Sequence, residues 1–231
     1  MIPIHDDNPT TITPYITYLL IILCVLVFLW ELSLAEQVER VFYSLGVVPA
    51  VLVGDQPLLP ELVIIPAWVS VFTSMFMHGG WMHLLSNMLY LWIFGNNIED
   101  AMGHWRFMVF YLICGIAAVF AQVLPDPDST IPMIGASGAI SGVLGAYLLL
   151  YPHARVLMAI PLGIFFYTVR IPAGFVLIFW FGMQLFSSYV TGQQQGGVAF
   201  GAHIGGFLAG MALIPFFRYK HHPLHILSKR F

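Results

Sequence analysis

The sequence predicts an all-α polytopic membrane protein, built as a bundle of six transmembrane helices in a single domain. Only 8% of its 231 residues are charged and 59% are hydrophobic, whereas soluble globular domains carry about 25% charged residues. A water-facing body of this size needs more polar surface than this chain has. Because each crossing of a bilayer takes about 20 apolar residues, the length allows half a dozen crossings with short connections.

Charge-poor apolar stretches bounded by Pro, Gly or charged residues mark the six expected helices. They lie at about residues 15–30, 81–98, 106–124, 136–151, 171–189 and 199–217. Two further apolar segments, 62–77 and 156–169, are short and contain proline, so we expect both to be half-embedded or interfacial. The segment 62–77 is near the lower length limit for a crossing, so a seven-helix arrangement with the N-terminus outside stays open.

The positive charges predict the orientation, because short loops rich in Lys and Arg stay on the cytoplasmic side. With both termini inside, seven of the eight Lys and Arg are cytoplasmic and only Arg40 lies outside. The seven are Arg106, Arg155, Arg170, Arg218, Lys220, Lys229 and Arg230. We therefore expect cytoplasmic termini and one domain over residues 1–231. Its core is at about 62–217, after the N-terminal helix and before a short basic tail, 218–231.

Composition also limits the partners and the location. A net charge of −3 with dispersed basic residues offers no patch for nucleic acid. Cys24 and Cys114 lie inside apolar runs, where cysteine is most often a small buried hydrophobe, so no disulfide framework is predicted. The first 13 residues contain no Lys or Arg, which argues against a cleaved signal peptide. We expect a bacterial inner membrane, since the chain is compact and shows no organelle-targeting presequence.

Four polar residues lie at a depth where lipid is expected. A polar side chain in the membrane costs free energy unless it has a polar partner, so its presence there indicates a functional site. Ser137 is at the start of the fourth helix, His203 is near the start of the sixth, and His83 and Asn87 are near the start of the second. These three helices all enter from the outside. The four side chains therefore fall at the same, extracytoplasmic end of the bundle, where one site can contain them.

Small residues let the fourth and sixth helices approach closely. They recur at helical spacing as Gly138, Ser141, Gly142 and Gly145 in the fourth helix and as Ala202, Gly206 and Gly210 in the sixth. This spacing allows two backbones to come into van der Waals contact. At 1.5 Å per residue, Ser137 is about 12 Å above Gly145 and His203 about 10 Å above Gly210. Parallel packing of the two stripes therefore predicts a hydrogen bond between Ser137 and His203.

A serine and a histidine in contact support nucleophilic chemistry. A serine hydroxyl is a weak nucleophile until a base takes its proton, and histidine does this best near neutral pH. We interpret Ser137 as the nucleophile and His203 as its base, acting through an acyl-enzyme that water resolves. The oxyanion is then held by the backbone N–H of Ser137 at a helix N-terminus, with Asn87 and His83 assisting.

The pair is predicted to act as a dyad, because no carboxylate is expected beside it. Asp126 and Asp128 lie in the loop 125–132, and Glu99 lies at the opposite, inner end. Taken singly, each feature also fits ordinary helix packing. The Gly-x-Ser-Gly around Ser137 can be a packing surface, His203 can be a hydrogen-bond donor between helices, and His83 and Asn87, at i and i+4, can join neighbouring helices by polar contacts. Their occurrence together on one side of the membrane favours chemistry.

A zinc site is the alternative reading of the histidines, since His78, His83 and His203 can supply three nitrogen ligands. The sequence has no His-Glu-x-x-His pair, and the outer halves of these helices carry no carboxylate to act as the base of a metalloprotease. We therefore expect neither a metal nor a cofactor.

The motifs that carry this chemistry resemble those of the rhomboid family of intramembrane serine proteases. The resemblance extends from Trp68 to Gly210. Three stretches carry it in family order and spacing: Met77-His78-Gly79-Gly80-Trp81-Met82-His83-Leu84-Leu85-Ser86-Asn87, Gly135-Ala136-Ser137-Gly138, and Ala202-His203-Ile204-Gly205-Gly206. It implies a six-helix bundle of rhomboid type with a long, partly embedded first loop, 31–80.

The resemblance also implies roles for individual residues. Ser137 matches the nucleophile, His203 its base, and His83 and Asn87 the oxyanion partners. His78 matches a supporting position. Gly135, Gly138, Gly206 and Gly210 are the small residues expected to support the site.

The chain departs from the family pattern at two places. Many rhomboids carry a Trp-Arg pair in the first loop, but here Trp68 is followed by Val69, and Trp105-Arg106 lies on the inner side. How the loop is fastened is therefore open. Four residues after the nucleophile, where some members place an aromatic ring against the histidine, this chain has Ser141. His203 is then held less firmly, or by another side chain.

The resemblance implies a single-pass membrane protein as substrate, cut near the outer end of its helix. A helix hides its carbonyls in hydrogen bonds, so the cut segment has to unwind, which Gly, Pro and small residues favour. The glycine-rich loop 190–198 is a candidate mobile cap, or an ordinary connector.

Two rival functions come from other classes. A non-catalytic adaptor that binds transmembrane helices, as some relatives of the family do, does not need Ser137 and His203 together. A small transporter fits less well, because the polar groups cluster at one end instead of near the midplane.

Overall fold

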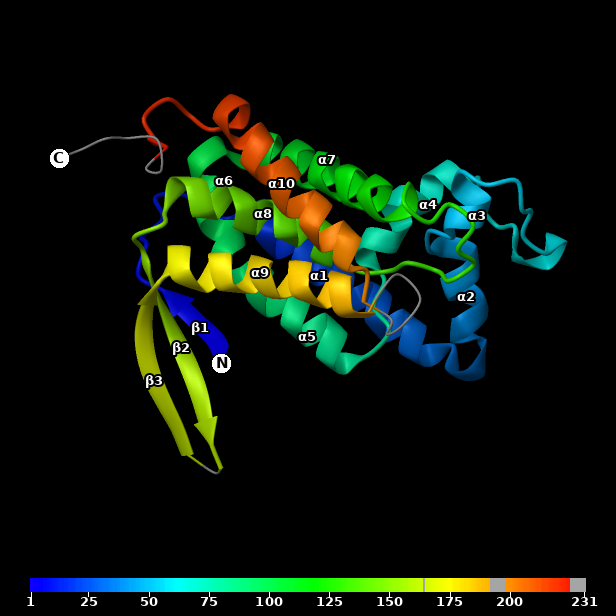
Figure 1. Cartoon of the computed structure of the whole chain (residues 1–231), viewed down its shortest axis with the longest axis horizontal. Helices are drawn as coiled ribbons and strands as arrows, with labels where there is room; N and C mark the ends of the chain where they lie inside the picture. Colours follow the sequence, from blue (N-terminus) through cyan, green and yellow to red (C-terminus); the bar gives the residue numbers. More distant parts are fainter. Residues whose placement is uncertain (164, 192–197, 225–231) are drawn as a thin grey trace.

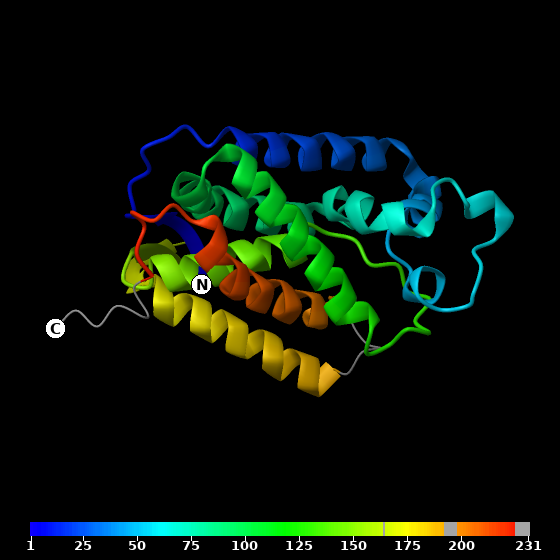
Figure 2. The ribbon, with the colours of Figure 1, turned by 90° about the horizontal axis from the view of Figure 1, so that it is seen from above.

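The structure, a computed structural model, describes residues 1–163, 165–191 and 198–224. It is mostly helical. Within the described residues, four helices are long and apolar enough to cross a membrane: α1 (Tyr15–Ser33), α7 (His104–Val123), α9 (Ala173–Thr191) and α10 (Phe200–Phe217). A shorter apolar helix, α8 (Ser137–Leu150), lies among them (Figure 1). Viewed from above, α1 and α9 lie on opposite sides of the bundle (Figure 2).

The stretch predicted as the second helix, 81–98, is helical but not uniform. It consists of α5 (Trp81–Tyr90), a π-helical turn η4 (Leu91–Gly95) and α6 (Asn96–Met102), which follow one another without a break. The whole run has the length of a membrane crossing. It ends at Gly103, whose φ of +80° lies in the left-handed region that suits glycine.

The segment 62–77 does not form a seventh crossing helix. Its helical part runs only from Ala67 to Phe76, as α4 (Ala67–Thr73) followed by a 3₁₀ turn, η3 (Ser74–Phe76). Ten residues rise about 15 Å, half of the roughly 30 Å hydrocarbon thickness. The rest of the first loop, at one end of the bundle in Figure 1, is made of short elements. These are η1 (Ala35–Gln37), α2 (Val38–Leu45), α3 (Pro49–Leu52) and η2 (Pro60–Leu62).

The prediction of an all-α fold was wrong for the end of the bundle opposite Ser137. There β1 (Ile2–Asp6), β2 (Arg155–Leu162) and β3 (Phe165–Pro172) form an antiparallel sheet in the order β1-β2-β3. The hairpin occupies the apolar segment 156–169, which is rich in β-branched and aromatic residues. Gly163, at φ +66°, lies in its turn. Tyr147 of α8 donates a 2.5 Å hydrogen bond to Asp6, which ties β1 to the bundle.

At the end of the bundle away from Ser137, three helices are tied together by one buried carboxylate. Glu99 of α6 is fully buried and accepts hydrogen bonds from the backbone N–H groups of Ile16 and Thr17 at 2.9 and 2.8 Å. It also lies 2.5 Å from Nδ1 of His104, at the start of α7. These N–H groups open α1 and have no partner within that helix. Glu99 therefore has a structural role at this end, away from Ser137.

Backbone contact between α8 and α10 forms the centre of the bundle. Twelve of the 14 residues of α8 are buried. A Cβ atom added at Gly206 would overlap the carbonyl oxygen of Gly138, and one added at Gly210 would overlap that of Gly142. The small-residue packing predicted from the sequence is confirmed, and it brings the starts of the two helices to the same level.

We expect Gly206→Ala to destabilise the protein, because the new methyl group forces α8 and α10 apart. Overpacking of this kind costs about 1–3 kcal/mol. The measurement is thermal unfolding in detergent. The matched control is Gly182→Ala on α9, where an added Cβ meets nothing within 4 Å. Equal midpoints for both variants would contradict the packing described above.

Candidate active site

The two residues at the centre of the site are joined by a direct hydrogen bond. Ser137 begins α8 and His203 lies in the first turn of α10. The distance between Ser137 Oγ and His203 Nε2 is 2.8 Å. Both side chains are half-buried. The contact expected from the glycine spacing is therefore present, although the two residues are 66 positions apart in the sequence.

The other ring nitrogen of His203 has a partner that the sequence analysis missed. Gln184 of α9 places Oε1 2.8 Å from His203 Nδ1. An amide oxygen only accepts, so Nδ1 carries the proton and Nε2 is free to accept from Ser137. Ser137, His203 and Gln184 thus form a chain of hydrogen bonds, and its third member is a neutral amide. A polar residue within an apolar membrane helix indicates a functional site, and this criterion, which selected Ser137 and His203, also applies to Gln184. The sequence therefore contained a signal for Gln184 that was not used.

The structure also shows how His203 is held although residue 141 is a serine instead of an aromatic residue. Ser141 donates a 2.6 Å hydrogen bond to the carbonyl oxygen of Ser137, within its own helix. The ring of Trp180, on α9, lies 5.9 Å from the His203 ring, centroid to centroid, at an interplanar angle of 36°. Trp180 and Gln184 are four residues apart and share a helix face. α9 therefore supplies both side chains that hold His203.

Gly135 brings His83 close to the serine. Its φ of +127° is a conformation that glycine adopts readily and other residues do not. A Cβ at this position would lie 2.7 Å from His83 Nε2 and 3.7 Å from Ser137 Oγ. The His83 ring and the Ser137 hydroxyl thus border the same small space, which is open because residue 135 has no side chain.

Two buried side chains, one on α5 and one just before it, each have a polar atom without a partner among the described residues. Asn87 is only 6% exposed, and its Nδ2 has no hydrogen-bond partner within the described ranges. Nε2 of His78 also has no partner there, but it is an acceptor, because Nδ1 donates to the carbonyl oxygen of Phe76 at 3.2 Å. The His78 ring packs edge-on against His83 at 5.1 Å. A buried donor without a partner costs free energy. Asn87, one turn after His83 on α5, is therefore in a condition to bind an acceptor that arrives from outside the chain.

The first loop is fastened by backbone pairing, which answers the question left by the absent Trp-Arg pair. Val47 and Met133 exchange two hydrogen bonds, from N–H to C=O, of 3.0 and 2.7 Å. The N–H of Gly135 donates to the carbonyl of Ser74 at 2.8 Å. The loop thus pairs with the segment that leads directly into Ser137 and fixes the backbone there.

A buried carboxylate that the sequence analysis placed in a loop also supports this end. α1 continues to Ser33, past the predicted end at residue 30, and carries Glu31 at 2% exposure. The Glu31 oxygens accept from the backbone N–H of His78 at 3.2 and 3.3 Å. This contact holds the chain just before α5 begins, and so helps to set the position of His83 and Asn87.

Two further expectations concern metal and the cap. Across the residues that the structure describes, no three His, Cys, Asp or Glu side chains are grouped to hold a metal ion. His203 instead faces Ser137 and Gln184. Most of the segment predicted as a mobile cap, 190–198, lies outside the described residues.

Comparison with known proteins identifies the family. The rhomboid domain matches residues 66–220. Rhomboid protein 1, mitochondrial, of Saccharomyces cerevisiae is 30% identical over 147 residues, which cover 62% of this chain and 40% of that protein. Rhomboid protease GluP of Bacillus subtilis is 33% identical over 146 residues, which cover 63% of this chain and 26% of that protein. The presenilin-associated rhomboid-like protein, mitochondrial, of Bos taurus is 30% identical over 216 residues, which cover 91% of this chain and 49% of that protein.

This chain spans about half the length, or less, of these curated relatives. The matched region contains α5, α8 and α10, with the three motifs that surround Ser137. The chain is an integral membrane protein that belongs to the rhomboid family.

Proposed function

We propose that the protein is an intramembrane serine protease that hydrolyses peptide bonds in or next to transmembrane helices of membrane-protein substrates. The observation that carries this proposal is the 2.8 Å hydrogen bond between Ser137 Oγ and His203 Nε2. Both side chains are half-buried, so part of each is accessible from outside the protein. Relatives named as rhomboid proteases support the same reading.

Acylation uses this pair directly. His203 Nε2 takes the hydroxyl proton while Ser137 Oγ forms a bond to the scissile carbonyl carbon, giving a tetrahedral oxyanion. When the oxyanion collapses, the C–N bond breaks and the proton on Nε2 passes to the leaving amine. The new end of the substrate remains attached to Ser137 as an ester.

The oxyanion needs donors placed in advance. The backbone N–H of Ser137, at the start of α8, has no partner inside its helix. The unpaired amide of Asn87 and the His83 ring beside Gly135 are the side-chain candidates. Donors of this kind are worth most when they are fixed and poorly hydrated, because they need no reorganisation as charge develops.

Water completes the cycle. His203 Nε2 takes a proton from a water molecule as its oxygen attacks the ester carbonyl, and the same oxyanion donors act again. Collapse breaks the bond to Ser137 Oγ, which recovers its proton from Nε2. The acid product leaves, and the pair returns to its starting state.

The proposed setting is a six-helix crossing with cytoplasmic termini and a partly embedded first loop. Four long helices, α8 and the α5–α6 run supply the crossings. The site then opens toward the extracytoplasmic side. A bacterial inner membrane is the proposed location, and a single-pass protein with a segment that unwinds easily is the proposed substrate.

We expect Ser137→Ala and His203→Ala each to lower cleavage of a single-pass reporter protein in proteoliposomes by at least about 1,000-fold, since each variant breaks the nucleophile–base unit. A fluorophosphonate is expected to label wild-type protein and not Ser137→Ala. Ser33→Ala, an exposed serine elsewhere, serves as the control. Equal cleavage by all four proteins would instead support the adaptor.

We expect Asn87→Ala to lower kcat about 100-fold, the usual effect of removing one oxyanion donor, while the thermal midpoint stays unchanged. The reason is that Nδ2 of Asn87 makes no hydrogen bond in the free protein. Asn97→Ala is the matched comparison, because Nδ2 of Asn97 donates to the carbonyl of Asn8 at 2.9 Å. That variant should lower the midpoint and spare kcat. A midpoint loss for Asn87→Ala without a kcat loss would contradict the oxyanion role.

A further inference from the structure

The face of α9 that lies toward His203 carries the side-chain amide of Gln184. Gln184 is half-buried within the apolar run 173–186 of α9, and large side chains such as Phe179 and Met183 are exposed on the outer side of this helix. A polar side chain in a membrane helix is retained where it has a polar partner. Here the partner is Nδ1 of His203, at 2.8 Å.

We propose that Gln184 is a positioning residue for His203, an inference that rests on the proposed protease function. Its Oε1 accepts the Nδ1 proton and so selects the ring tautomer in which Nε2 can take the proton of Ser137. The same hydrogen bond fixes the rotation of the ring about its Cβ–Cγ bond. Its contact is with Nδ1, whereas Ser137 contacts Nε2, so Gln184 acts on the serine only through the histidine ring.

Two neighbouring side chains strengthen this inference. Ser141, where the family often has an aromatic ring against the histidine, bonds to the Ser137 carbonyl and leaves His203 without that support. Trp180, on the same face of α9 as Gln184, packs its ring beside His203. Since the indole gives no acceptor for Nδ1, Gln184 is the group that decides the tautomer.

The kinetic test compares two substitutions of similar size. Gln184→Met removes the acceptor, and we expect kcat to fall about three- to tenfold with KM unchanged, as suits the loss of one hydrogen bond. Gln184→Glu keeps an oxygen acceptor and should retain kcat within about twofold. Met183→Leu, on the exposed side of the same turn, is the control. Wild-type kcat in Gln184→Met would overturn the role.

A second readout does not need proteolysis. In protein labelled with ¹⁵N-histidine, the ring signals of His203, identified by their loss in His203→Asn, report which nitrogen is protonated. We expect Nδ1 protonation in wild type and in Gln184→Glu, and a mixture of tautomers in Gln184→Met. Identical signals in wild type and Gln184→Met would reject the positioning role. The expected signals in a wild-type protein that does not cleave would reject the protease proposal alone.

A separate observation concerns the hairpin of β2 and β3 at the opposite end of the bundle. Its tip exposes three consecutive aromatic residues, Phe165, Phe166 and Tyr167, at 71, 67 and 61%. The segment 156–169 contains no charged residue. In water, an apolar hairpin with an open strand edge favours aggregation. Its surroundings are therefore expected to be apolar.

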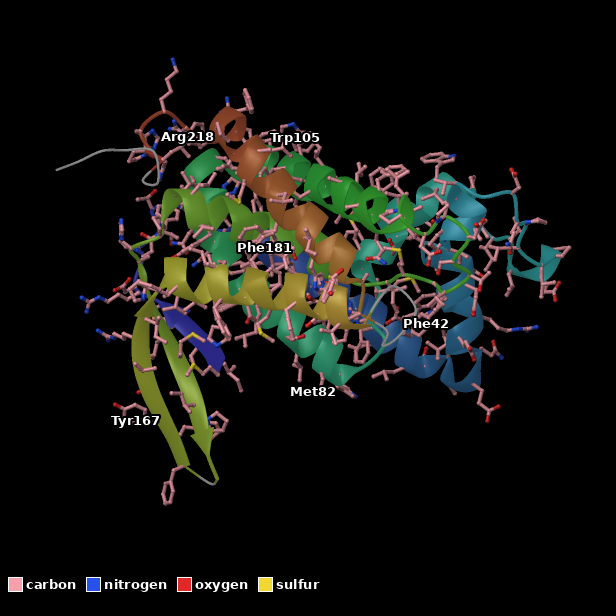
Figure 3. All side chains as sticks on the ribbon, in the orientation of Figure 1. Phe42, Met82, Trp105, Tyr167, Phe181 and Arg218 are labelled. Atoms are coloured by element: carbon pink, nitrogen blue, oxygen red, sulfur yellow. The ribbon has the colours of Figure 1, made fainter. Side chains whose placement is uncertain are left out.

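The position of the hairpin indicates what surrounds it. β3 ends at Pro172, directly before Ala173, where α9 begins, so the base of the hairpin lies at the end of a membrane-crossing helix. The strands leave the bundle sideways, and the tip stays near the level of the inner helix ends (Figure 1). Tyr167 projects away from the helices (Figure 3).

We infer that the hairpin lies in the bilayer interface, with its tip among the headgroups and the first acyl carbons. Successive strand residues point to opposite faces, so the tip is apolar on both faces. A protein partner covers one face, whereas the interface surrounds both. The open edge of β3 has backbone groups that hydrocarbon cannot satisfy, which keeps the hairpin at the depth where aromatic side chains gather. The exposed Arg155 and Arg170 lie at its base.

The test is the depth of a nitroxide attached to Phe166→Cys in proteoliposomes. The native cysteines, Cys24 and Cys114, are fully buried and are not expected to react. We expect frequent collisions with oxygen and few with a water-soluble nickel chelate, relative to a label at His153→Cys, an exposed site at the same end. Collisions with nickel equal to those at position 153 would place the tip in water. Few collisions with both reagents would indicate a covering protein. Either result overturns the inference.

Discussion

The geometry of the candidate site depends on one contact, the meeting of the α8 and α10 backbones. In lipid the hydrophobic effect does not draw two apolar helices together, so close van der Waals packing has to hold them. The carbonyl oxygens of Gly138 and Gly142 of α8 lie against Gly206 and Gly210 of α10, where a Cβ atom would overlap them. Because the contact is between backbones, it fixes the relative height of the helices. The height sets the distance from Ser137 to His203.

The other parts of the fold each fix a different degree of freedom around that pair. α9 sets the rotation of the histidine ring through Gln184 and Trp180. The first loop fixes the backbone before Ser137 by pairing Val47 with Met133. Glu31 holds the chain before α5, which carries the donors expected to face an oxyanion. Distance, ring orientation and donor placement thus come from three different regions of the chain.

The sequence predicted what depends on local pattern and missed what depends on single distant contacts. Apolar length located the helices, and glycine spacing predicted the contact of Ser137 with His203, because both signals repeat along the chain. Gln184 belongs to no repeat. β1 pairs with β2 across about 150 residues, and Tyr147 meets Asp6 over a separation of 141. Such pairings leave no periodic trace. The segment 62–77 was ambiguous because its apolar length is near the lower limit for a crossing, whereas its helix begins only after Pro66.

The two ends of α9 have different constraints, and this bears on how the histidine is held. Among the four long helices in the described part of the chain, α9 is the least buried. At one end Gln184 and Trp180 contact His203; at the other, the chain passes directly into the hairpin. A helix with so little protein contact is free to move unless its ends are held. Since the α8–α10 contact does not involve α9, a displacement of α9 would release Nδ1 of His203 while leaving the approach of α8 to α10 intact. A hairpin held in the interface, as inferred above, would limit that displacement from the far end, and the orientation of the His203 ring would then depend partly on the membrane itself.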